Sequence, residues 1–382
     1  MRSWAILLIC ALLGGCASAP PAAPLAQALL ADTSFEAPSE RIDATEVFAL
    51  SDAMRRYLRS DIAGQMRMHG RQRGLIDALY QRNQLKLDYD SSVTRNAAQA
   101  FEARAGNCLS LVIMTAAFAK ELGLKVEFQS AWTEEAWLRS GDLYFRSGHV
   151  NITLGKRLAD FGSGFDLNTV TVDFLPAQTS RTLRTSAITE QRVVAMFMNN
   201  RAAEALVQGH IADAYWWARE GIAQDPTFMS VVNTLGVIYR RHGDIDRSEA
   251  VFRHVLAQEP ANTRAMANLV QLLDHAGRSA EASALKARLV QLEPYPPFHF
   301  FNLGLAAMQN NDFKTARDLF EKEVDRADYY HEFHFWLGLA NFKLGDYDAA
   351  RKQLALAMEN SGSRGERDIY AAKLAWLKSQ QH

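Results

Sequence analysis

The sequence predicts a two-part chain, in which an α+β domain is followed by an all-α solenoid of stacked helix pairs. Two observations support this fold class. Glycines recur every 34 residues in the second half, at Gly209, Gly243, Gly277 and Gly345. In the first half, Cys108 stands at the head of a very apolar segment that is followed by alternating stretches. A long fixed period is typical of helical repeats, and a buried helix followed by alternating strands predicts an α+β layer.

The first sixteen residues indicate a secretory leader. Arg2 supplies a positive charge, and the apolar run Trp4–Leu13 is too short for a permanent membrane helix. The run ends in Leu-Gly-Gly before Cys16, which resembles a bacterial lipobox. The resemblance implies that Cys16 is lipidated and anchors the chain in a membrane. An ordinary signal peptide, cut after Ala19, is the alternative.

Ala17 follows the cysteine, with no aspartate there, which resembles lipoproteins of the bacterial outer membrane. We therefore expect a lipid-anchored, periplasm-facing protein. Residues 17–34 begin with a Pro/Ala-rich stretch that is too poor in large apolar residues to fold, so we interpret them as a tether.

Composition excludes several function classes. The chain has 42 Lys plus Arg against 43 Asp plus Glu, so no charge excess attracts nucleic acid. Cys10 leaves with the leader and Cys16 would be lipidated, so Cys108 has no partner for an internal disulfide. The spacing of His and Cys indicates no metal site, and no glycine-rich phosphate loop follows a strand, so we expect no cofactor.

Residues 35–180 form the predicted α+β domain. Thr45–Leu58 has the pattern of an amphipathic helix, and Asn107 is suited to cap a buried helix over Leu109–Gly123. Further predicted elements are a helix over Val93–Arg104 and strands over Lys125–Ser130, Val150–Leu154 and Thr169–Phe174.

This region resembles the transglutaminase-like branch of the papain-like cysteine enzymes over about residues 97–175. The motifs that carry the resemblance are Ala100-Phe101, Arg104-Ala105-Gly106-Asn107-Cys108, Leu122-Gly123-Leu124, Gly148-His149-Val150-Asn151 and Val172-Asp173-Phe174. The resemblance implies a nucleophile, an imidazole and an acid from Cys108, His149 and Asp173. This sequence departs from the family after the histidine, where Val150 replaces the usual aromatic residue.

Each member of such a triad has a chemical role. A thiol attacks as the thiolate, which a helix N-terminus and an imidazolium favour. The acid orients the imidazole. Asp166 competes with Asp173 for this place, and Asp160 is a weaker candidate. The amide of Cys108 could hold an oxyanion together with Gln99 or Asn96, both weak candidates. The product would be a thioester, resolved by water or by an amine.

The second half resembles tetratricopeptide repeats. The clearest unit contains Leu235-Gly236, Tyr239, Phe252 and Pro260 at the family's positions. We predict about five repeats over residues 181–364 and a C-terminal capping helix over 365–382. The resemblance implies a concave groove suited to a peptide or a protein partner. The oligomeric state stays open.

Three functions remain after this reading of the sequence. The first is a lipoprotein enzyme with a Cys108-His149-Asp173 site that acts on peptide or amide bonds, with repeats that dock a protein substrate or partner. The second is a non-catalytic binding or assembly lipoprotein, because enzyme folds also host binding functions. The third is a cell-wall amidase whose repeats join a larger complex.

Overall fold

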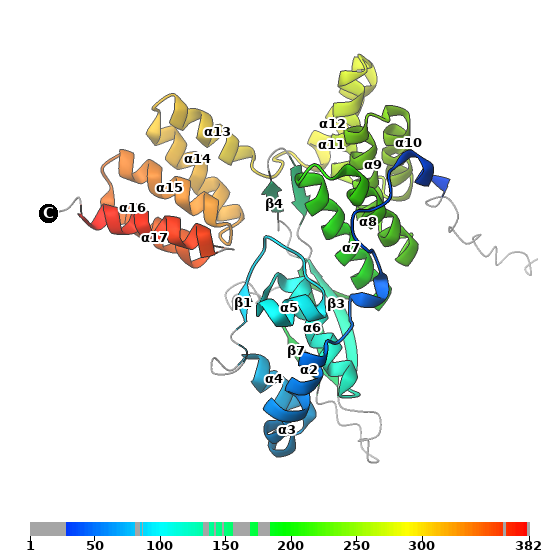
Figure 1. The fold of residues 1–382 in the computed structure, drawn as a ribbon. Coiled ribbons are helices and arrows are strands. Elements are labelled where there is room, and N and C mark those ends of the chain that lie inside the picture. The colour runs from blue at the N-terminus through cyan, green and yellow to red at the C-terminus, as the bar shows by residue number, and fades with distance from the viewer. Residues whose placement is uncertain are drawn as a thin grey trace, which may run out of the picture.

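The computed structural model describes residues 28–80, 85, 87–132, 137–140, 143–146, 149–155, 169–174, 184–361 and 364–379. The leader, Cys16 and most of the expected tether therefore lie outside the described residues. In the described part, no helix is both long and apolar enough to cross a membrane. Figure 1 shows a mixed α+β domain and two arms of helices that extend from it.

The N-terminal domain combines short helices with three small sheets. Its helical elements are η1 (Asp32–Ser34), η2 (Ala44–Glu46), α2 (Asp52–Arg56), η3 (Tyr57–Asp61), α3 (Ala63–His69), α4 (Arg71–Tyr80), α5 (Ala97–Ala103) and α6 (Cys108–Glu121). Its strands are β1 (Asp88–Tyr89), β2 (Ala105–Gly106), β3 (Lys125–Trp132), β4 (Trp137–Ser140), β5 (Leu143–Arg146), β6 (His149–Gly155), β7 (Val170–Val172) and β8 (Arg184–Ile188).

The main sheet has the order β7-β6-β3-β8, and all its strand pairs are antiparallel. Alternation along β6 places Val150, Ile152 and Leu154 on one face, and all three are fully buried. These side chains belong to the same apolar core as the buried helix α6. The helix-on-sheet layer expected from the sequence is therefore present.

Strand β8 lies in this sheet although the repeats were expected to begin at residue 181. Ala187 pairs with Gln129 of β3, so residues 184–188 complete the sheet before the first repeat helix starts at Glu190. The expected boundary at residue 180 falls before this strand.

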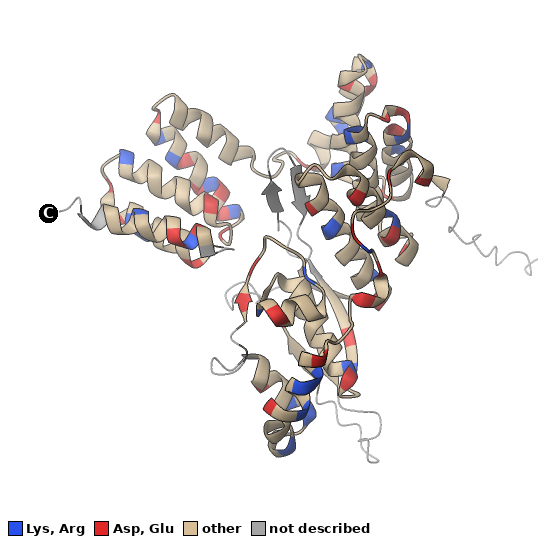
Figure 2. Ribbon diagram, in the orientation of Figure 1, with Lys and Arg blue, Asp and Glu red and all other residues tan. Residues whose placement is uncertain are grey.

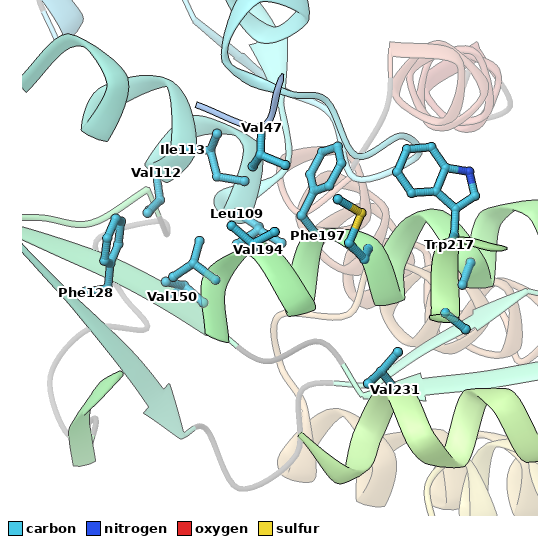
Figure 3. Packing of buried hydrophobic residues seen from close by; sticks show 14 of the residues in the cluster. Val47, Leu109, Val112, Ile113, Phe128, Val150, Val194, Phe197, Trp217 and Val231 are labelled. Atoms are coloured by element: carbon cyan, nitrogen blue, oxygen red, sulfur yellow. The ribbon is translucent and has the colours of Figure 1, made fainter. Parts of the chain in front are cut away.

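The core continues from the sheet into the helical region. Figure 3 follows it from Phe128 and Val150 on the sheet, past Leu109 on α6, to Val194 and Phe197 on α7. The domain and the first repeats thus share one buried apolar cluster, which holds the two parts in a fixed relation.

Five helix pairs and a terminal helix follow in residues 190–361 and 364–379. They are α7 (Glu190–Val207), α8 (Ile211–Gln224), α9 (Met229–His242), α10 (Ile245–Gln258), α11 (Thr263–His275), α12 (Ser279–Leu292), α13 (His299–Gln309), α14 (Phe313–Arg326), α15 (His331–Lys343), α16 (Tyr347–Glu359) and α17 (Arg364–Ser379). Gly236 on α9 allows close packing within a pair, since an added Cβ would lie 2.5 Å from the Phe252 ring of α10. Gly304 meets Phe320 in the same way two repeats later.

The helical region divides into two arms between α12 and α13. One apolar core extends from the domain to Ala282, and a second begins at Phe298. The connection contains Pro294, Pro296 and Pro297, which cannot continue a helix ladder. Figure 1 shows α13–α17 as an arm separate from α7–α12. The solenoid expected as one stack is therefore divided into two blocks.

The chain before the domain packs against the first repeats. Phe35 stacks on Tyr215 of α8 with ring centroids 4.0 Å apart. The Tyr215 hydroxyl accepts a hydrogen bond from the backbone N–H of Ala31 at 2.8 Å and donates one to Asp32 at 2.6 Å. Arg219 also contacts Asp32 at 3.0 Å. We call residues 28–43 the N-terminal strap. Residues 28–34, expected to belong to a free tether, are therefore held in place by aromatic and polar contacts.

Candidate functional site

Cys108 is the first residue of α6, and local sequence fixes this start. Asn107 is the N-cap, and its side-chain oxygen accepts hydrogen bonds from the Ser110 N–H and hydroxyl, each at 2.9 Å. Gly106 leaves room for this turn, because a Cβ there would lie 2.7 Å from Cβ of Ser110. The cysteine is 6% exposed. It lies at the positive end of the helix dipole, which favours a thiolate.

His149 and Asp173 meet at the ends of neighbouring strands. His149 begins β6, and Asp173 follows the last residue of β7. Their side chains form a hydrogen bond of 2.8 Å between Nε2 of His149 and Oδ1 of Asp173. His149 is 4% exposed, whereas the Asp173 side chain retains 24% exposure. The carboxylate thus fixes the orientation of a buried imidazole.

The second ring nitrogen of His149 is the atom that would exchange a proton with a substrate or thiol. This Nδ1 is buried and has no hydrogen-bond partner in the described part of the chain. Burial alone would lower the pKa of His149, but hydrogen bonding and charge from Asp173 and Cys108 raise the pKa to about 9. Because the thiol contributes to this shift, Cys108 is the neighbour of the imidazole. An imidazolium next to a thiol favours the thiolate form.

The structure places the other candidate residues differently. Gln99 and Asn96 form a reciprocal capping box at the start of α5, with hydrogen bonds of 3.1 and 2.9 Å. Local capping therefore engages the Gln99 side chain, and neither residue lines the cavity described below, so we no longer consider them oxyanion donors. Asp160 and Asp166 lie outside the described residues, so their competition with Asp173 stays open.

Tyr89 is a neighbour of Cys108 that sequence reasoning missed. Strand β1 pairs with β2, and Tyr89 stands opposite Gly106, two residues before the cysteine. Tyr89 is 40% exposed. Burial of its hydroxyl region and the nearby Cys108 and Asp90 raise the pKa of Tyr89, so its hydroxyl stays protonated as a donor at neutral pH. No local sequence pattern marks Tyr89, because its position depends on a two-residue parallel strand pair.

Hydrogen bonds connect the Cys108 helix to the first repeat. Glu204 of α7 accepts a hydrogen bond of 2.7 Å from the backbone N–H of Thr94. The Thr94 hydroxyl accepts a hydrogen bond of 2.9 Å from the Asn107 amide. Arg201 forms an ion pair with Glu204 at 3.0 Å. The cap of the cysteine helix is therefore positioned in part by a residue of the helical repeats.

A cavity of about 1680 Å³ joins the cysteine to the inner side of the helical arms. Cys108 and Tyr89 line it from the domain, Asn199 and Asn233 from α7 and α9, and Phe335 from α15. His149 and Asp173 are not among its lining residues, so the cysteine is the triad candidate that faces this space. Figure 2 shows acidic and basic residues interspersed along both arms, so no face in this view carries a single charge sign.

Comparison with known families agrees with the helical half of this architecture. Two family models match, at residues 239–296 and 301–364, and both describe a tetratricopeptide repeat. The C-terminal half of the chain is a tetratricopeptide-repeat solenoid. Such repeats serve as surfaces for binding other proteins, so this half of the chain has an architecture for protein–protein interaction. No match is found among curated proteins.

Solved structures with similar helical arrangements include PilF of Pseudomonas aeruginosa, which is 19% identical with a TM-score of 0.30. The match covers 50% of this chain and 88% of that one. MamA of Desulfovibrio magneticus is 21% identical, with a TM-score of 0.26 and coverages of 46% and 97%. A thermophilic TPR protein of Thermus thermophilus is 14% identical, with a TM-score of 0.30 and coverages of 47% and 99%. None of these likenesses bears on what the chain binds.

Proposed function

We propose that this chain is a lipid-anchored, periplasm-facing protein whose Cys108, His149 and Asp173 act on peptide or amide bonds of a protein held by the TPR repeats. The single observation that carries the catalytic part is the buried His149–Asp173 hydrogen bond of 2.8 Å beside a cysteine that begins a helix. The resemblance to transglutaminase-like enzymes supports the same assignment of roles.

The proposed reaction uses the thiolate of Cys108 and the imidazolium of His149. Sγ attacks the carbonyl carbon of the amide, and the backbone N–H of Cys108 stabilises the negative oxygen. The C–N bond then breaks, and His149 gives its proton to the leaving amine. A thioester remains on Cys108. Water or a second amine attacks this thioester, loses its proton to His149, and releases the acyl group as an acid or as a new amide.

The sequence around Cys16 supports the proposed location. A short apolar run before Leu-Gly-Gly-Cys matches a lipobox, and the docked strap begins only twelve residues after that cysteine. Mass spectrometry of the N-terminal peptide from membrane fractions tests this part. Recovery of an unmodified, soluble N-terminus that starts elsewhere would contradict it.

The catalytic part is tested by alkylation of Cys108 with iodoacetamide across pH 5–10, in the chain that begins after Cys16. A thiolate–imidazolium pair predicts fast labelling at pH 6, well below the pKa of about 8.5 of a free cysteine. His149→Ala is the matched control and should restore slow labelling at pH 6. Labelling no faster than a model thiol at pH 6, with no effect of His149→Ala, would refute the catalytic proposal.

One observation favours a second function, a binding protein without catalysis. The Cys108 side chain is 6% exposed, and a buried, inert thiol is also what a structural cysteine shows. In that case the domain is a rigid support for the repeats. Cys108→Ala would then leave the biological function intact, whereas substitutions in the cavity lining of α7, α9 and α11 would abolish it.

A further inference from the structure

The inner helices of the first three repeats carry a row of uncharged hydrogen-bonding side chains. Asn199 and Asn200 lie on α7, Asn233 and Thr234 on α9, and Asn268 on α11, and all five line the cavity. They recur at intervals of 34 or 35 residues, so equivalent positions of successive repeats present them. We call these five residues the amide row.

Neighbouring members of the amide row are in direct contact. The Thr234 hydroxyl donates to Oδ1 of Asn199 at 2.7 Å, and Nδ2 of Asn268 donates to Oδ1 of Asn233 at 3.2 Å. These bonds engage the carbonyl oxygens of Asn199 and Asn233. Their Nδ2 groups remain to donate to a ligand, and Oδ1 of Asn268 remains to accept. All five side chains are partly buried, which limits their rotation before any ligand arrives.

From this row we propose that the TPR groove holds an extended polypeptide through its main chain and leads it to Cys108. The proposal rests on the proposed function and names its substrate class. A peptide main chain alternates one donor and one acceptor per residue, which matches uncharged amides that donate and accept. Packed helices lie about 8–10 Å apart and an extended chain advances about 3.3 Å per residue, so each repeat would contact about three residues.

The lining of α7, α9 and α11 favours a peptide over a sugar or a nucleobase. These three helices lie wholly in the described part of the chain, and none of their lining residues is aromatic. Sugar rings and bases usually stack on aromatic side chains, whereas main-chain amides need hydrogen-bonding groups at regular intervals. Recognition through the main chain also predicts tolerance of many side chains.

The amide row and Cys108 belong to one continuous body. The apolar core that includes α6 also includes α7, α9 and α11, and Glu204 of α7 contacts the loop before the cysteine helix. Both sites line the same cavity. A chain bound along the row can therefore pass the cysteine without any rearrangement of the two parts.

The test measures binding separately from chemistry by use of the full chain with Cys108→Ala. The probe is a fluorescein-labelled, uncharged twelve-residue peptide of mixed Ala, Ser and Gln, and anisotropy gives its Kd. N-methylation of alternate residues should weaken binding by about tenfold or more, because it removes main-chain donors. A scrambled peptide of the same composition should bind within about twofold. This comparison changes the ligand and leaves the protein fold untouched.

Protein variants complete the test. The triple variant Asn199→Ala, Asn233→Ala, Asn268→Ala should weaken binding by about tenfold or more. Gln258→Ala with Gln291→Ala removes exposed amides from the outer helices α10 and α12 and should leave Kd unchanged. The proposal is overturned by absence of peptide binding, by scrambling that matters more than N-methylation, or by tighter binding of an N-acetylglucosamine oligomer. Failure of rapid Cys108 labelling refutes the proposed catalysis and leaves this binding result to stand by itself.

Discussion

The Thr94 backbone N–H donates a hydrogen bond of 2.7 Å to the carboxylate of Glu204, across the junction between the α+β domain and the first repeat. Thr94 is 2% exposed, and its hydroxyl accepts from the residue that caps the cysteine helix. A repeat helix and the candidate nucleophile are therefore linked by two hydrogen bonds. Glu204 is a positioning residue, since it acts through Thr94 and Asn107 and not on a substrate.

Glu204→Ala should disturb Cys108 as well as stability. The substitution leaves the buried Thr94 N–H without a partner, which costs about 1–3 kcal/mol of unfolding free energy. It should also slow Cys108 alkylation at pH 6, because the helix cap loses its support. Glu204→Gln keeps an acceptor oxygen and should retain most of the labelling rate. Equal effects of both variants on labelling would show that charge, and not the hydrogen bond, matters.

The raised pKa of His149 predicts a loss of stability at alkaline pH. The folded-state pKa is about 9, above the value of about 6.5 expected in the unfolded chain. The stabilisation is fully present below pH 6.5 and is lost as pH rises through 9, because the folded chain holds the proton longer. The difference should be on the order of 1–3 kcal/mol. Urea unfolding at pH 6, 8 and 10 measures it. His149→Gln should remove this part of the pH dependence.

Substitutions of Asp173 separate orientation from charge. Asp173→Asn keeps an oxygen that can accept from Nε2 of His149 but removes the negative charge, so the pKa of His149 should fall. Asp173→Ala removes both contributions. We therefore expect alkylation of Cys108 at pH 6 to decrease in the order wild type, Asp173→Asn, Asp173→Ala. Indifference to both changes would exclude Asp173 from the site and direct attention to Asp166.

Gly236→Ala should destabilise the second repeat by about 1–3 kcal/mol, since the new methyl group would collide with the Phe252 ring. The double variant Gly236→Ala, Phe252→Leu should recover part of the loss. Gly365→Ala is the matched control, because an added Cβ there meets nothing within 4 Å. In helix α17 that change should be neutral or slightly stabilising. Thermal unfolding midpoints distinguish the three variants.

Local signals in the sequence identify the elements around the cysteine. Asn107 was expected to cap a helix and does so, because a side-chain oxygen three residues before a free N–H is a local arrangement. The expected helix over Thr45–Leu58 was wrong. Ser51 caps a separate short helix, α2, and the preceding residues 44–46 form one turn of 3₁₀ helix. Apolar spacing alone did not reveal that second start.

Long-range contacts were invisible in the sequence for a physical reason. The bond from Ala31 to Tyr215 spans 184 residues, and neither residue belongs to a periodic pattern that includes the other. The amide row could have been found earlier, since Asn199 and Asn233 repeat at the period of the glycines. Its meaning needed the structure, which shows that these positions face the cavity with Cys108. The division of the solenoid was signalled by Pro296 and Pro297 but depends on how the helices on both sides pack.

The docked strap shortens the leash between a lipidated Cys16 and the repeats. Only residues 17–27 then remain to separate the bilayer surface from the strap, and an extended chain of that length reaches about 40 Å. Phe35 and Tyr215 would keep the first repeats within that radius of the membrane. The protein would consequently sample a thin layer next to the bilayer, where polypeptides emerging from the membrane pass at high local concentration.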